Sequence, residues 1–164
     1  LSGNARSLHA MNAALHASVM AGAMARAFEM TLEHCNDRQQ FGRPLGKFQA
    51  VQHQLAEMAE HAVAVSMAAQ WAFDTDARVP DLLRAAMAKS RASRAVPLIA
   101  NTAHALHGAI GVTQEFDLQL YTRLLHAWRI ACGSETYWDG LVGREVMASD
   151  QTLAEFVRTA GEVA

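Results

Sequence analysis

One polar turn in this alanine-rich chain carries side chains that suit a charged ligand with an aromatic ring. Arg38, Phe41 and Gln49 stand close together there, among glycines and a proline. A guanidinium binds phosphate through paired N–H groups, a phenylalanine ring stacks on flat ring systems, and a glutamine amide donates or accepts at a ring edge. The pattern therefore fits an anion attached to a ring system. It equally fits an arginine that, with Asp37, only closes the end of a helix.

The eight histidines of the chain do not form a recognisable metal-binding pattern. Helical bundles that bind two iron ions use Glu-x-x-His, and no glutamate here has a histidine three residues later. His53, Glu57 and His61 share one helical face, but no second helix offers a matching pair. We interpret these three residues as a solvated polar stripe and predict no metal site.

Composition excludes several other classes of protein. A net charge of -2 gives no basic surface for nucleic acid or for membranes, and no apolar run reaches the roughly 20 residues of a membrane-spanning helix. Neither a dinucleotide-binding glycine loop after a strand nor a Gly-x-Ser-x-Gly sequence is present. Cys35 and Cys132 lie far apart, which argues against disulfides and zinc. We expect a cytoplasmic protein whose partner is a small molecule or another protein.

The elements that must position the polar turn are helices. Apolar residues recur at helical spacing through most of the 164 residues, a length that suits one domain. Asp81 and Ser134 are predicted to begin helices, and Pro97 to kink or break one. We predict an all-α, antiparallel up-and-down helical bundle that forms a single domain over residues 1–164. The expected helices span about residues 6–37, 47–73, 82–106, 117–128, 135–147 and 150–158.

Three polar corners of the sequence resemble signatures of the acyl-CoA dehydrogenases, in their C-terminal helical domain. The resemblance covers roughly residues 1–147. The family's Arg-x-x-Phe-Gly-x-x-Leu-x-x-x-Gln pattern stands here as Arg38, Phe41, Gly42, Leu45 and Gln49. Its His-Gly-Gly-x-Gly signature stands as His107, Gly108, Ala109, Ile110 and Gly111, with Glu115 after it. The third signature is represented by Arg123, Gly133, Ser134, Arg144 and Glu145.

The resemblance implies a flavoprotein with FAD bound between the subunits of a homo- or hetero-oligomer, a dimer or a tetramer. The full enzyme of such a family binds acyl-CoA and removes hydrogen from its α and β carbons. A glutamate takes the proton beside the thioester carbonyl while a hydride passes to the flavin. The residues that the resemblance assigns to FAD are Arg38, Gln40, Phe41, Gln49, Gly108, Ala109, Ser134 and Thr136.

The chain departs from the family at the positions that carry the catalytic base. In the family the glutamate directly precedes the Gly-Ser pair or lies on the first helix, and these positions are Cys132 and Asn12 here. Asn cannot abstract the proton, and an ordinary thiol with a pKa of about 8.5 is mostly protonated at neutral pH. Glu135 is the nearest substitute, but it is displaced by three residues. Ala105 also replaces a glutamine that contacts the flavin in the family.

Two functions remain open from the sequence. The first is an FAD-binding and oligomerisation domain of an acyl-CoA dehydrogenase-like protein, in a non-catalytic subunit or a fragment that is inactive alone. In a heteromeric enzyme the partner chain would carry the glutamate. The alternative is a structural or interaction bundle that has lost flavin binding.

Overall fold

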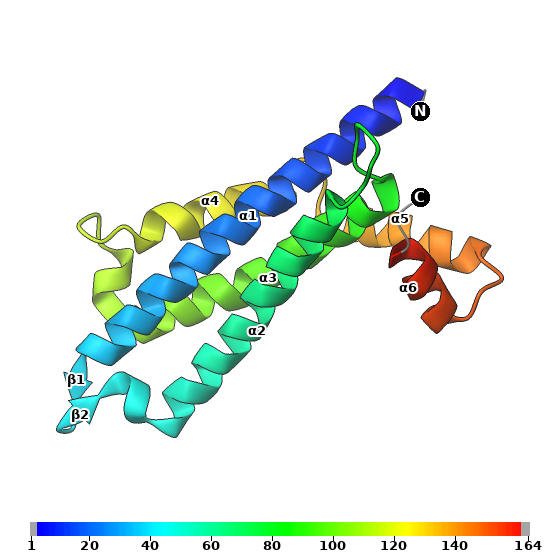
Figure 1. Cartoon of the computed structure of the whole chain (residues 1–164). Coiled ribbons are helices and arrows are strands. Elements are labelled where there is room, and N and C mark those ends of the chain that lie inside the picture. The colour runs from blue at the N-terminus through cyan, green and yellow to red at the C-terminus, as the bar shows by residue number, and fades with distance from the viewer. Residues whose placement is uncertain (1–2, 162–164) are drawn as a thin grey trace.

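The computed structural model describes residues 3–161, which form an α-helical fold with one very short hairpin (Figure 1). The long helices are α1 (Gly3–Asp37), α2 (Gln49–Ala72), α3 (Leu82–His107), α4 (Leu118–Ile130), α5 (Glu135–Ala148) and α6 (Leu153–Gly161). The short elements are β1 (Gln39–Gln40), β2 (Arg43–Pro44) and the single turns η1 (Leu45–Lys47) and η2 (Gly108–Val112).

The first four α-helices run alternately up and down beside one another, as Figure 1 shows. α3 packs against α1, α2, α4 and α5 and is the central helix of the fold. α5 and α6 lie beyond one end of the bundle, beside the start of α3. The predicted fold class, an all-α antiparallel bundle, is confirmed.

Small side chains dominate the buried faces of the bundle. Alanines line the inner stripes of α1 and α3, and methionines fill the gaps between helices. Alanine has the highest helix propensity and lets neighbouring backbones approach closely, while the flexible methionine side chain adapts to irregular spaces. The fully buried residues include Ala13, Ala17, Met20, Met24, Met58, Ala92, Ala95 and Trp138.

All six predicted helices are present, with ends displaced by three residues or fewer. Asp81 caps α3 as predicted, because its carboxylate accepts from the amides of Leu83 at 2.9 Å and Arg84 at 3.0 Å. Ser134 stands at the N-cap of α5, but its side chain makes no capping hydrogen bond. α3 continues through Pro97 without a break, since buried residues on both sides hold it in the core.

The hairpin of β1 and β2 was not predicted, because strands of two residues are too short for any alternation of apolar and polar residues. It joins α1 to α2 at the end of the bundle opposite α5 (Figure 1). None of the helices described here is long and apolar enough for a membrane span.

Candidate functional site

The first polar corner is a rigid hairpin at the end of α1. The Arg38 amide donates to the His34 carbonyl at 2.9 Å, and the Leu45 amide donates to the Arg38 carbonyl at 2.9 Å. Phe41 and Gly42 form the two-residue turn with φ values of 51° and 78°. Two positive φ angles define a type I′ turn, which matches the twist of the paired strands. The backbone therefore holds Phe41 at the hairpin tip, where it is 90% exposed.

An arginine that sequence reasoning missed completes this corner. The Arg43 guanidinium lies 4.1 Å from the centroid of the Phe48 ring, and the Phe41 and Phe48 rings meet edge to face at 6.2 Å. Such contacts fix a cation over an aromatic face. Arg43 lies between Arg38 and Gln49, and this position in the first polar corner was the signal that could have identified it. The predicted ligand-binding residues Arg38, Gln40 and Gln49 are all exposed beside it.

The second polar corner ends α3 with an open backbone. Gly108 has a φ of 65° and donates its amide to the His104 carbonyl, which closes the helix. Gly108 and Ala109 are both exposed, so a ligand can approach their backbone closely. Gly111 is required for packing, because a Cβ there would lie 2.8 Å from the Cβ of His107.

Two histidines join the first and second corners. The His107 ring stacks on the His34 ring with centroids 4.4 Å apart, and His107 Nδ1 lies 2.8 Å from the Ala103 carbonyl oxygen. His107 is 5% exposed, and burial lowers the pKa of His107 and of His34 below the ordinary value of 6.5. These neutral rings hold the end of α3 against the end of α1.

The third polar corner is a left-handed turn between α4 and α5. Cys132 and Gly133 have φ values of 58° and 97°. The indole Nε1 of Trp138 donates to the Cys132 carbonyl at 3.0 Å. A Cβ on Gly133 would lie 2.9 Å from both Trp138 Nε1 and Tyr137 Cδ1. Only glycine fits this position without displacing an aromatic ring.

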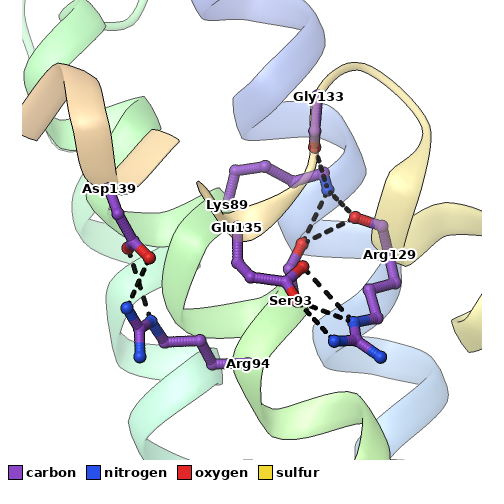
Figure 2. Close-up of polar contacts among 7 residues, drawn as sticks. All are labelled: Lys89, Ser93, Arg94, Arg129, Gly133, Glu135 and Asp139. Carbon is purple, nitrogen blue, oxygen red and sulfur yellow. Dashed lines mark hydrogen bonds and ion pairs between the residues drawn. The ribbon is translucent and has the colours of Figure 1, made fainter. Parts of the chain in front are cut away.

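A buried lysine lies directly under this turn. Lys89 of α3 is fully buried, and its Nζ contacts Ser93 Oγ at 2.8 Å and the carbonyl oxygens of Arg129 at 3.0 Å and Gly133 at 3.2 Å (Figure 2). Burial lowers the pKa of Lys89 to about 8. Lys89 was missed although its spacing from Ala85, Ala92 and Val96 places it on the core face.

Two ion pairs surround the third corner. The Arg129 guanidinium pairs with the Glu135 carboxylate across the turn, and Arg94 of α3 pairs with Asp139 of α5 (Figure 2). Ser90 also donates to Asp139. The hydrogen bond from Arg129 holds the pKa of Glu135 below its ordinary value. Glu135 is therefore a carboxylate that stays ionised and engaged, which makes it a weak base.

The third corner lies at the opposite end of the bundle from the first two. Near the start of α1, His9 Nε2 lies 3.0 Å from the Tyr137 hydroxyl and the His9 ring stacks on Trp138 at 4.6 Å. The hairpin follows the end of the same helix, at Asp37. With a rise of 1.5 Å per residue, the two ends are roughly 42 Å apart. The bundle therefore does not bring all three corners together.

The predicted cofactor residues divide between these two ends. One end carries Arg38, Gln40, Phe41, Gln49, Gly108 and Ala109, and the other carries Ser134 and Thr136. Ala105, where the resemblance expects a glutamine, is an exposed residue near the end of α3 that carries the second corner.

Both positions where a catalytic base was expected lie at the third corner's end. Asn12 shares a helical face with His9 and His16, and the His16 ring contacts the Trp128 ring at 6.0 Å. Cys132 is half-buried in the turn, and burial raises the pKa of its thiol. Both positions therefore lack a group that accepts a proton at neutral pH.

No cluster of three histidine, cysteine or carboxylate side chains within residues 3–161 is arranged to hold a metal ion. His53 and Glu57 are exposed on α2, as expected for a solvated stripe, and His61 is half-buried.

Comparison with known proteins gives one consistent result. The family model described as acyl-CoA dehydrogenase, C-terminal domain, matches residues 4–147. The acyl-CoA dehydrogenase IpdE2 of Mycolicibacterium smegmatis is 38% identical over 114 residues, which are 70% of this chain and 35% of that protein. This chain thus spans about a third of the length of the relatives it matches.

Solved structures agree with the sequence relatives. A glutaryl-coenzyme A dehydrogenase in complex with glutaryl-CoA matches with a TM-score of 0.82 and 26% identity, over 88% of this chain and 37% of that one. A chain of the ChsE4-ChsE5 complex from Mycobacterium tuberculosis matches with a TM-score of 0.74 and 25% identity, over 88% of this chain and 40% of that one.

Proposed function

Because the chain belongs to the acyl-CoA dehydrogenase family, we propose that it is an FAD-binding and oligomerisation domain in an enzyme that dehydrogenates acyl-CoA thioesters. In this proposal it forms a non-catalytic subunit, or the corresponding part of a longer chain. Bound FAD would supply the acceptor for the hydride that leaves the β carbon.

The observation that carries the proposal is the exposed Phe41 ring at the tip of a rigid hairpin. A phenylalanine with positive φ is strained, and a ring that is 90% exposed contributes nothing to the core. Its neighbours Arg38 and Arg43 are cations suited to a pyrophosphate, and Gln40 and Gln49 are amides suited to a base edge. These residues fit the phosphate and adenine end of FAD.

The separation of the two ends supports an oligomer. An extended FAD molecule is shorter than the roughly 42 Å of helix between the hairpin and the third corner. If both ends contact flavin, they contact different flavin molecules, and each flavin then lies between two subunits. The ChsE4-ChsE5 complex is a related assembly of two different chains, which supports a hetero-oligomer as well as a homo-oligomer.

The lost base positions support a non-catalytic role. Asn12 cannot accept a proton, the pKa of Cys132 is raised by burial, and the Glu135 carboxylate is held by Arg129. In a hetero-oligomer the partner chain would supply the glutamate.

Flavin binding is tested by purifying the chain with its partner and recording the visible flavin spectrum. We expect a yellow complex in which Arg38→Ala reduces FAD affinity by about tenfold, the effect of losing one charge-assisted contact. Arg78→Ala, an exposed arginine in the loop before α3, is the matched control and should leave affinity unchanged. A colourless wild-type complex that ignores added FAD would favour the structural bundle instead.

A further inference from the structure

Lys89 is a buried cation whose three partners are neutral oxygens. Its ammonium has three N–H donors, and these meet Ser93 Oγ and the carbonyls of Arg129 and Gly133. Ser93 Oγ also donates to the Arg129 carbonyl at 3.0 Å. All three N–H groups of the Lys89 ammonium therefore have a hydrogen-bond partner.

The nearby carboxylates are engaged elsewhere. Glu135 pairs with Arg129, and Asp139 pairs with Arg94 (Figure 2). Asp139 also accepts a hydrogen bond from Ser90. Burial of an ammonium without a carboxylate at hydrogen-bond distance is costly, and a lysine with a depressed pKa reflects that cost. An apolar side chain of the same length would have a lower desolvation cost at this position than the Lys89 ammonium.

The two carbonyls held by Lys89 lie on either side of the left-handed turn. Arg129 is in the last turn of α4, and Gly133 directly precedes the N-cap of α5. Trp138 holds the Cys132 carbonyl between them at 3.0 Å. The direction in which α5 leaves the turn is thus set by three donors, two of them from one ammonium.

We propose that Lys89 is a positioning residue for the flavin. Its ammonium fixes the turn between α4 and α5, so that Ser134 and Thr136 are presented to the cofactor at the start of α5. This inference rests on the proposed function, which assigns those two residues to FAD. It adds a residue of α3 that lies beneath the cofactor-facing segment.

The first test is Lys89→Met in the flavin-containing assembly. Methionine keeps an unbranched chain and removes the charge. We expect a melting temperature at or above that of the wild type, unchanged helicity by circular dichroism, and FAD affinity reduced at least tenfold. A merely structural lysine would instead lower the melting temperature and leave the affinity of the folded fraction unchanged, and that result would overturn the proposal.

The matched control is Arg94→Met, which removes another α3 cation that contacts α5. The hydrogen bonds of Arg94 go to Asp139, one turn further along α5, so FAD affinity should stay within twofold of the wild type. An equal loss of affinity in both variants would mean that general contact between α3 and α5, rather than the turn, governs flavin binding.

A second measurement separates this inference from the proposed function. The amides of Tyr137 and Trp138 donate to the Ser134 carbonyl at 3.1 Å and 3.2 Å and report the first turn of α5. We expect hydrogen exchange of these amides to be at least tenfold faster in Lys89→Met, whether or not flavin is bound. Unchanged exchange would overturn the role of Lys89 in fixing the turn, even if the wild type binds FAD. Faster exchange, found together with a wild-type assembly that binds no FAD, would support the hold of Lys89 on the turn and reject the proposed function.

Ser93→Ala serves if Lys89→Met does not fold. It removes one of the three oxygens around the ammonium and the second hold on the Arg129 carbonyl. The same amides should then exchange about threefold faster, an effect smaller than loss of the whole cation. Exchange equal to that of the wild type would again contradict the proposal.

Discussion

The two ends of the bundle hold their polar corners in different ways. At the hairpin end, backbone hydrogen bonds within a few residues of sequence fix the turn, and the side chains are free to meet a ligand. At the other end, the turn is fixed by Trp138, which lies six residues after Cys132, and by Lys89 of α3, which lies 40 and 44 residues from the carbonyls it holds. The difference teaches that a short signature identifies the first kind of corner, whereas the second kind depends on residues outside its signature.

Both ends nevertheless carry a residue that the fold alone does not favour. Phe41 adopts a left-handed conformation at an exposed tip, and Lys89 buries an ammonium without an ion pair. Local conflicts of this kind concentrate at functional sites. Each end thus holds one residue in an unfavourable state. At the hairpin local backbone hydrogen bonds hold it there, whereas at the other end contacts between α3 and the turn do so.

The largest effect should separate two glycines, one from each end. Gly133→Ala should lower the free energy of unfolding by about 3 kcal/mol, from a disfavoured φ and a clash with buried Trp138. Gly42→Ala has a similarly disfavoured φ of 78° but no atom within 4 Å of the new Cβ, so about 1 kcal/mol is expected. Urea unfolding of both variants measures the difference.

Equal losses in the two glycine variants would contradict the comparison of the ends. They would show that the left-handed backbone alone sets the cost and that packing against Trp138 adds nothing. Gly133→Ala can also be made in a Trp138→Phe background, where the ring at the contact is shorter. If the alanine then lowers the free energy of unfolding by less than it does in the wild type, the clash with Trp138 is the source of the cost.

The next effect is a loss of stability between pH 7 and pH 5 that arises from the histidine pair at the hairpin end. Burial lowers the pKa of His107 and His34, so the unfolded chain binds more protons once the pH falls below the ordinary value of 6.5. Their stabilisation is present above pH 6.5 and is lost as the pH falls through the lowered values. The cost of leaving a buried polar group without a partner is about 1–3 kcal/mol.

His107→Phe keeps an aromatic ring beside His34 and Phe116 and removes the titration of that residue. The loss of stability between pH 7 and pH 5, followed by denaturant unfolding, should be smaller in this variant than in the wild type. The exposed His53→Gln is the control and should keep the wild-type slope. Identical slopes in all three proteins would exclude the histidine pair as the cause.

A smaller effect should come from the ion pair beside the third corner. Glu135→Gln should cost about 1 kcal/mol, because the Arg129 and Glu135 side chains are 34% and 20% exposed and solvent screens the pair. The Arg26–Glu29 ion pair is more exposed than this one, so Glu29→Gln should cost less than about 0.5 kcal/mol. Loss of acyl-CoA oxidation by the assembly in Glu135→Gln, with flavin retained, would instead make Glu135 the base.

The helices could be predicted from sequence because each carries its own apolar spacing and its own end signals. Asp81 followed Pro80, and the hydrogen bonds at the start of α3 are those expected of an aspartate cap. The Lys89 cluster could not be predicted, since its carbonyl partners lie 40 and 44 residues away and no periodicity links them. The signal in the sequence was a lysine at helical spacing from residues of the apolar face, and this spacing alone does not show which groups the lysine contacts.

The smallest effect on stability should accompany a clear effect on flavin binding. Phe41→Asn places Asn-Gly in the type I′ turn, the pair that this turn prefers, and should stabilise the fold by about 0.5 kcal/mol. The same change removes the exposed ring, so FAD affinity should fall. A hairpin that becomes more stable while flavin binding weakens would show that Phe41 is kept for the ligand, as Lys89 is at the other end. If stability and FAD affinity both stay unchanged, the Phe41 ring serves neither the fold nor the cofactor. That result would contradict the proposed role of the hairpin tip in FAD binding.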